Sequence, residues 1–230
     1  FAIREKNENV WIAQRQGRAK NSNDLTQPAI LKMMAMGGEG TVIERLKQLH
    51  IVPLSISYEY DPCDYLKARE YQLRRDLPYW KKTAEDDLES MLVGIKGYKG
   101  HIFYKCAPCI DDWLDTVDEE LPKNKLFDTI AAHIDHEIHS NYRLYPINYV
   151  ALDMIQDSRV YEEYYTAEDY QNFEAYLEGQ IEKVKIDNRD DKFLRTCLLT
   201  QYAYPAKNYI AASSENGRLK SLLSRLTFLK

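Results

Sequence analysis

The sequence predicts an α/β protein: a partial, mainly parallel sheet of about three strands, flanked by helices and followed by a helical extension. Three short runs rich in apolar, β-branched and aromatic residues are typical of strands, at residues 9–14, 51–60 and 101–110. Helical patterns separate these runs, and after residue 111 long helical patterns dominate. We therefore expect an α/β part over residues 1–112 and a helical extension over residues 113–230.

The first half of the chain alternates between strand and helix patterns. Residues 25–36 predict a helix, because Pro28 stands in the first turn and a pair of glycines follows the pattern. A second helix is predicted over residues 40–50, where apolar residues recur on one face. The strand at 51–60, IVPLSISYEY, opens with a nearly continuous apolar run, which is typical of a buried position in a sheet.

Further helices precede and follow the third strand. Residues 61–77 and 83–97 have helical patterns, and Thr83 with Asp86 resembles a capping box. The later helical patterns cover residues 123–142, 145–157, 166–185, 190–212 and 217–229.

Composition limits the classes of function. The formal net charge of −5 argues against general nucleic-acid binding. The chain contains no apolar run of the roughly 18–20 residues that a membrane span needs. Four cysteines in 230 residues do not indicate a disulfide framework, so we expect a reducing, cytoplasmic setting.

A basic, glycine-containing loop follows the first predicted strand. Arg15 and Arg18 offer forked, charge-assisted donors and Lys20 adds a third cation, while Gly17 lets the backbone approach a ligand. In an open α/β sheet, ligands bind beyond the carboxyl ends of the strands, where this loop would lie. From the residues alone, a phosphate-binding loop and a solvated turn with surface cations have equal weight.

The stretch VWIAQRQGRAK, followed by NSNDLTQPAILKM and then by IVPLSISYEY, resembles the glycerolipid acyltransferase family. The resemblance is close over about residues 9–60 and loose over 61–112. It implies a set of residues that bind the acceptor's phosphate, namely Arg15, Gly17, Arg18 and Lys20. It also implies supporting positions at Gln16 and Pro53. Most family members have Glu where this chain has Gln16, so any role of that negative charge is lost.

By this resemblance the chain belongs to the carboxyl-terminal part of an acyltransferase of phospholipid biosynthesis. Such enzymes move an acyl group from acyl-CoA or acyl-ACP, as a cosubstrate, to the hydroxyl of glycerol 3-phosphate, lysophosphatidate or a similar acceptor. We expect no resident cofactor. The helical region resembles an extension on some bacterial members. The implied location is cytoplasmic or peripheral on the cytoplasmic face of the inner membrane.

The family's catalytic His-X4-Asp block does not occur in this chain. There the His is the general base for the acceptor hydroxyl and the Asp orients it. The residues five positions after the five histidines are Ser55, Cys106, Ile138, Asn141 and Leu144. We therefore predict no catalytic residue in this chain, and no activity of the chain alone. Either the block precedes Phe1 in a longer protein, which the start without Met favours, or the chain is a degenerate homologue. The alternative function is a non-catalytic binding module, helical or α/β, for a phosphorylated ligand or a protein partner.

Two short stretches of the sequence contain residue types that can bind metal ions. His133, His136 and Glu137 would share a helix face, but with His139 they do not form the His-Glu-X-X-His spacing of zinc proteases. We expect a solvated helix face there. The Cys-X-X-Cys pair at 106–109 is single and ends a strand, so we expect ordinary, partly buried thiols. No metal site is predicted.

The carboxyl-terminal stretch GRLKSLLSRLTFLK, residues 217–230, is amphipathic and basic. Packing on the helical region is the preferred interpretation. Contact with an anionic membrane surface is the alternative.

Overall fold

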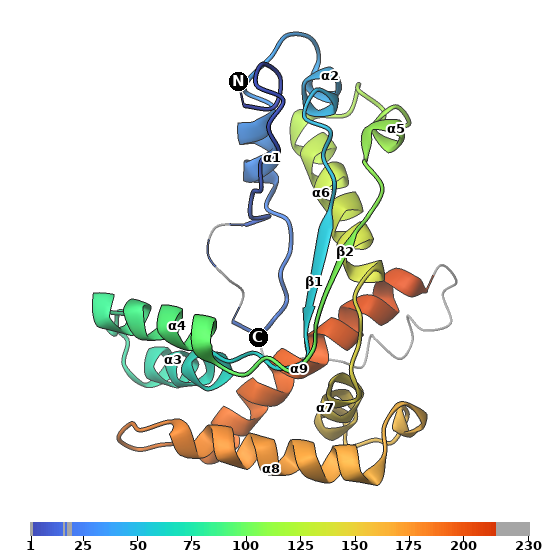
Figure 1. The fold of residues 1–230 in the computed structure, drawn as a ribbon. Helices are drawn as coiled ribbons and strands as arrows, with labels where there is room; N and C mark the ends of the chain where they lie inside the picture. The colour runs from blue at the N-terminus through green and yellow to red at the C-terminus, as the bar shows by residue number, and fades with distance from the viewer. Residues whose placement is uncertain (1, 16, 18–19, 215–230) are drawn as a thin grey trace. The chain divides into compact units, whose positions relative to one another are not determined.

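The predicted fold class is wrong: over the residues that the structure describes, the chain is mostly helical, and its sheet has two antiparallel strands instead of about three mainly parallel ones (Figure 1). The computed structural model describes residues 2–15, 17 and 20–214. Strands β1 (Leu54–Tyr58) and β2 (Ile102–Cys106) confirm the predicted positions of two strands. The backbone N–H of Glu59 donates to the carbonyl of His101, and that of Ala107 donates to the carbonyl of Pro53, both at 2.9 Å. The residue numbers rise on one strand as they fall on the other, so the pairing is antiparallel.

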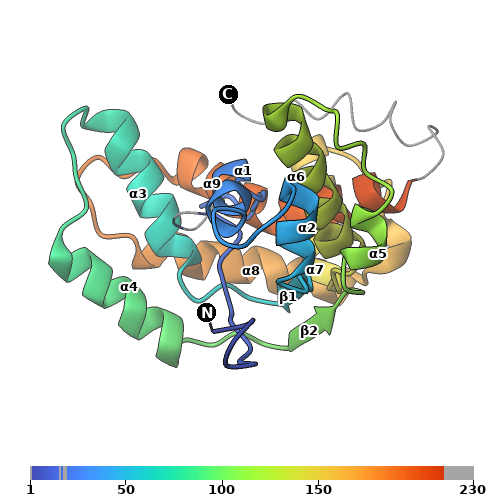
Figure 2. The same cartoon turned by 90° about the horizontal axis from the view of Figure 1, so that it is seen from above.

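The two helices between the strands account for their opposite directions. Helices α3 (Asp64–Asp76) and α4 (Ala84–Lys96) have 13 residues each. Figure 2 shows the chain passing through α3, a loop and α4 before it enters β2. The guanidinium of Arg69 on α3 contacts the carboxylate of Asp86 on α4 at 2.6 Å. Because α3 leads away from the end of β1 and α4, of the same length, leads back to it, β2 starts beside the end of β1 and runs in the opposite direction. A parallel strand would need a connection that crosses to the start of β1.

The first predicted strand, over residues 9–14, does not form. The described part of the chain contains no strand there, and the side chains of Val10, Trp11 and Ile12 are exposed. The carbonyl of Gln14 instead accepts a hydrogen bond from the backbone N–H of Gln27 at 2.8 Å. A pattern of apolar residues makes a strand only when a neighbouring strand supplies a ladder of backbone hydrogen bonds, and the described residues supply none here.

The described chain divides into two compact units. Unit 1 comprises Phe1–Arg18, Asp24–Ser55 and Tyr104–Tyr142, and unit 2 comprises Ala19–Asn23, Ile56–Phe103 and Arg143–Lys230. Both units take segments from each side of residue 112, where the sequence predicted a boundary.

Unit 1 is built on one long helix. Its helices are α1 (Pro28–Met34), α2 (Val42–Lys47), α5 (Asp111–Leu114) and α6 (Lys123–Ser140). Helix α1 packs on α6 and α2 packs on α5. Leu31, Leu46, Leu114 and Ile130 are among the fully buried side chains of this core. The buried apolar residues of α6 therefore belong to the same core as those of α1, α2 and α5.

Unit 2 contains the larger core. Besides α3 and α4 it includes α7 (Pro146–Gln156), the 3₁₀ helix η1 (Glu162–Tyr164), α8 (Ala167–Lys183) and α9 (Asp191–Ser213). Helix α7 packs against α8 and α9, and α3 packs against α8 and α9 (Figure 1). Phe173, Leu177, Leu194 and Leu198 are completely buried in this core.

The remaining helix predictions are confirmed where the structure describes them. The Thr83–Asp86 capping box is present at the start of α4. The predicted helix over 217–229 lies outside the described residues. No helix in the described part of the chain combines the length and apolarity needed to cross a bilayer.

Candidate anion-binding site

Arg15, in unit 1, presents donors that its surroundings do not fully use. Its guanidinium Nη1 lies 3.6 Å from the Oδ1 of Asp24, which is beyond normal hydrogen-bond length. The Nε of Arg15 is buried and has no hydrogen-bond partner among the described residues, and the same holds for the Nε2 of Gln14. Buried N–H groups without acceptors are costly, so this segment is suited to receive an anion.

Hydrogen bonds connect the segment from Asp24 to Gln27, which follows the basic loop, to α6 and to Gln14. Besides the hydrogen bond between Gln27 and Gln14, the backbone N–H of Thr26 donates to the Oδ1 of Asp135 at 2.8 Å. The Nε2 of His139 lies 3.4 Å from the carbonyl oxygen of Asp24. These contacts hold Asp24, the partner of Arg15, against the carboxyl-terminal half of α6.

Burial sets the protonation of the α6 groups. It raises the pKa of Asp135 and lowers the pKa of His139, and the nearby Asp135 carboxylate only partly offsets the second effect. The imidazole of His139 therefore favours its neutral form, in which its N–H can donate to a backbone carbonyl.

His139 does not belong to the predicted solvated face of His133, His136 and Glu137, and it is only 7% exposed. The ring of His133 also stacks on Trp113, with ring centroids 3.7 Å apart. Only His136 of the three is exposed. A signal was present: Ala131 lies on the buried stripe of α6, and Asp135 and His139 follow it at intervals of four residues.

Lys20, the other predicted phosphate-binding cation that the structure describes, belongs to unit 2. Its ammonium group contacts the Oε1 of Glu70, which also receives the guanidinium of Arg74 at 2.7 Å. Glu70 is only 7% exposed, so a nearly buried carboxylate balances the charge of Lys20. The loop that carries Lys20 is also held by the amide of Asn208, which donates to the Oδ1 of Asn23 at 3.1 Å.

The backbone at Gly17 has the conformation that a glycine permits. Its φ is +72°, and apart from Gly17 and its two chain neighbours no atom of the described residues lies within 4 Å of the place that a Cβ would occupy. Gln16 and Arg18 lie outside the described residues. Pro53 is buried and precedes β1, and its carbonyl accepts the hydrogen bond from Ala107. Of the predicted positions, Gly17 thus has the backbone freedom that a binding loop needs, and Pro53 extends the pairing of β1 with β2.

Comparison of the chain with protein-family models, with curated proteins and with solved structures finds no match.

Proposed function

We propose that this chain supplies the phosphate-binding part of the acceptor site of a glycerolipid acyltransferase. The observation that carries the proposal is the pair of buried donors on Arg15 and Gln14 that have no hydrogen-bond partner among the described residues, close in sequence to Gly17. A phosphate ester would satisfy such donors and would compete with the long Arg15–Asp24 contact, because it carries more charge than a carboxylate. The order of a basic loop and a proline-led strand supports the same assignment.

In this proposal the phosphate serves to position the acceptor. Arg15 and Arg18 bind the phosphate oxygens, and this fixes the acceptor hydroxyl relative to the reacting groups. A general base then takes the hydroxyl proton and the oxygen attacks the thioester carbonyl. The C–S bond breaks, and the base returns the proton to the departing thiolate of CoA or of the acyl carrier protein. No histidine of this chain has an Asp five positions on, so the proposal requires a base from outside these 230 residues.

The location follows from the substrates. Acyl-CoA and acyl-ACP are cytoplasmic compounds, so we propose a cytoplasmic enzyme that works at the membrane surface. Residues 217–230, which carry the amphipathic basic pattern, are the proposed membrane contact; they lie outside the described residues.

Replacing Arg15 with alanine is expected to weaken the binding of glycerol 3-phosphate by about 10-fold or more, because a charged donor is lost. Isothermal titration calorimetry or NMR titration of the 230-residue chain measures this. Arg159→Ala, which removes an exposed arginine of unit 2, is the matched control and should leave binding unchanged. Equal affinity of the wild type and Arg15→Ala would overturn the assignment.

Arg18→Glu tests the same site by kinetics. In a protein that joins this chain to a His-X4-Asp block, it should raise the acceptor KM strongly and leave the acyl-donor KM unchanged, since the donor does not use the phosphate site. The isolated 230 residues should show no turnover, and measurable turnover would contradict the proposed absence of a base.

The binding module remains the second candidate, and the absence of a His-X4-Asp pair from the sequence favours it. It predicts phosphate binding without preference for the glycerol part. If inorganic phosphate binds as tightly as glycerol 3-phosphate, and no acyl transfer occurs when the block is supplied, the module is the better assignment.

A further inference from the structure

We propose that unit 1 contains a zinc site formed by His50, Cys109 and Asp111. One imidazole nitrogen of His50, the thiol sulfur of Cys109 and one carboxylate oxygen of Asp111 lie within 4.8 Å of one another. The three residues are separated by up to 61 positions in the sequence. This inference does not depend on the proposed acyltransferase function.

Backbone hydrogen bonds hold the two segments of the site together. The N–H of Ile110 donates to the carbonyl of Ile51 at 3.0 Å, and that of Ala107 donates to the carbonyl of Pro53 at 2.9 Å. These bonds extend the β1–β2 pairing beyond the ends of the strands. His50 therefore lies opposite Cys109 and Asp111 through main-chain pairing, before any ligand is bound.

One oxygen of the Asp111 carboxylate is buried and accepts no hydrogen bond from the described residues. Its Oδ2 lies 2.6 Å from the Nδ1 of His50, whereas its Oδ1 is buried and has no hydrogen-bond partner among the described residues. A buried carboxylate oxygen without a donor is costly, and a cation would remove that cost.

His50 has a backbone conformation that residues other than glycine rarely adopt. Its φ is +48°, in the left-handed region. It follows the end of α2, with its N–H donating to the carbonyl of Lys47 at 3.1 Å. This turn brings the imidazole to Asp111, and such strained positions are concentrated at functional sites.

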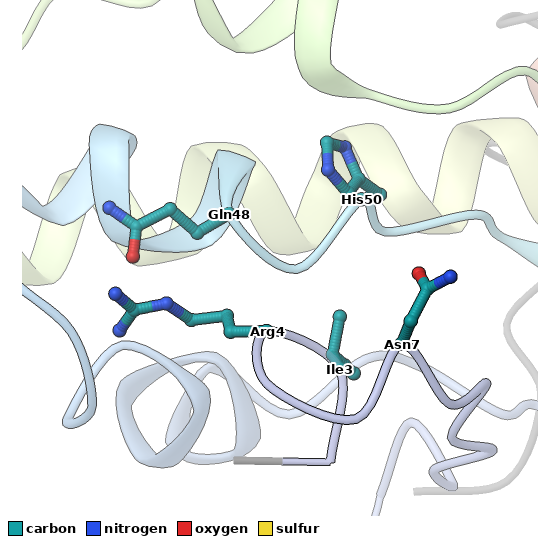
Figure 3. A pocket seen from close by; sticks show the side chains of 5 residues that line it. All are labelled: Ile3, Arg4, Asn7, Gln48 and His50. Carbon is teal, nitrogen blue, oxygen red and sulfur yellow. The ribbon is translucent and has the colours of Figure 1, made fainter.

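The donor set fits zinc better than calcium or magnesium. Nitrogen, sulfur and oxygen donors are the ligands of Zn²⁺, whereas Ca²⁺ and Mg²⁺ require oxygen alone. Three protein ligands leave the fourth tetrahedral position for water. His50 also lines a cavity of about 390 Å³ (Figure 3), with Gln48 on its own side and Ile3, Arg4 and Asn7 opposite. This cavity gives solvent access from the His50 side.

The Cys-X-X-Cys pair provides a matched control. Cys106 and Cys109 are both exposed, contrary to the partly buried thiols that the sequence predicted, but only Cys109 belongs to the cluster. Cys106→Ser and Cys109→Ser make the same chemical change three residues apart.

The metal-free, reduced 230-residue chain should bind one equivalent of Zn²⁺, and Co²⁺ should produce a thiolate-to-cobalt absorption band. Cys109→Ser should abolish the band and weaken Zn²⁺ binding by about 10-fold or more, because removal of a ligand costs more than removal of its supporting partners. Cys106→Ser should match the wild type. His50→Ala provides a second variant, with circular dichroism to check folding.

Two results would overturn the proposal. In one, Cys109→Ser and His50→Ala bind Zn²⁺ as tightly as the wild type, which would show unspecific binding. In the other, Cys106→Ser loses binding as fully as Cys109→Ser, which would assign the metal to the cysteine pair without His50.

Discussion

Replacing Leu198 with alanine is expected to lower the free energy of unfolding by about 2–5 kcal/mol. Leu198 lies on α9, is completely buried, and belongs to the core that α9 forms with α3 and α7. The substitution removes buried methyl groups and leaves a cavity that close-packed helices fill only in part. Urea denaturation followed by circular dichroism measures the loss.

The same substitution on α4 is the control. Leu92 is 47% exposed, and α4 has no buried residue. Leu92→Ala should therefore cost less than about 1 kcal/mol, since little apolar surface returns to water. If the two variants lost equal stability, the assignment of the unit 2 core to α9 and its neighbours would be wrong.

The second large effect concerns the pH dependence of stability at Asp64. This carboxylate is completely buried in unit 2, and its Oδ2 accepts hydrogen bonds from the hydroxyls of Tyr176 and Tyr202, both at 2.6 Å. Burial raises the pKa of Asp64 from 3.8 to about 6, and the two tyrosine hydrogen bonds offset part of the rise.

A raised pKa makes the folded state hold a proton that the unfolded chain releases. Between pH 3.8 and about 6 the folded state binds more protons, so its stability falls as the pH rises through this window and then levels off. The shift corresponds to roughly 3 kcal/mol. The free energy of unfolding of the wild type, minus that of Asp64→Asn, should fall by most of this amount between pH 4 and pH 7, because Asn does not titrate.

Tyr176→Phe refines this test. It removes one donor that stabilises the ionised carboxylate, so the pKa of Asp64 should rise further and the window should extend to higher pH. Carboxyl-selective NMR titration measures this pKa directly. An Asp64 that titrates at its ordinary value in the wild type would contradict the burial that we describe.

Helices were the most predictable part of this protein. The Pro28 and Thr83 start signals and the apolar periodicity of residues 123–142 mark α1, α4 and α6, because these signals act within a few residues. The strand positions at 54–58 and 102–106 could also be predicted from patterns within a few residues. The relative direction of the two strands could not, since it depends on where α3 and α4 return the chain.

In the basic loop, too, only local features could be predicted. The sequence alone identified Arg15 and Lys20 as cations close to each other in the sequence. It did not identify Asp24 and Glu70 as their respective partners, because the carboxylate of Glu70 comes from a helix 50 residues beyond Lys20.

By itself, then, the sequence determined the longer helices that the structure describes and two of its three predicted strand positions, because both depend on short-range periodicity and capping. Only the tertiary structure decided that β1 and β2 are antiparallel, that residues 9–14 do not form a strand, and that His50 lies close to Cys109 and Asp111. Each of these depends on which distant segment supplies a backbone partner, and hydrogen-bond pairing between distant segments leaves no periodic trace in the sequence.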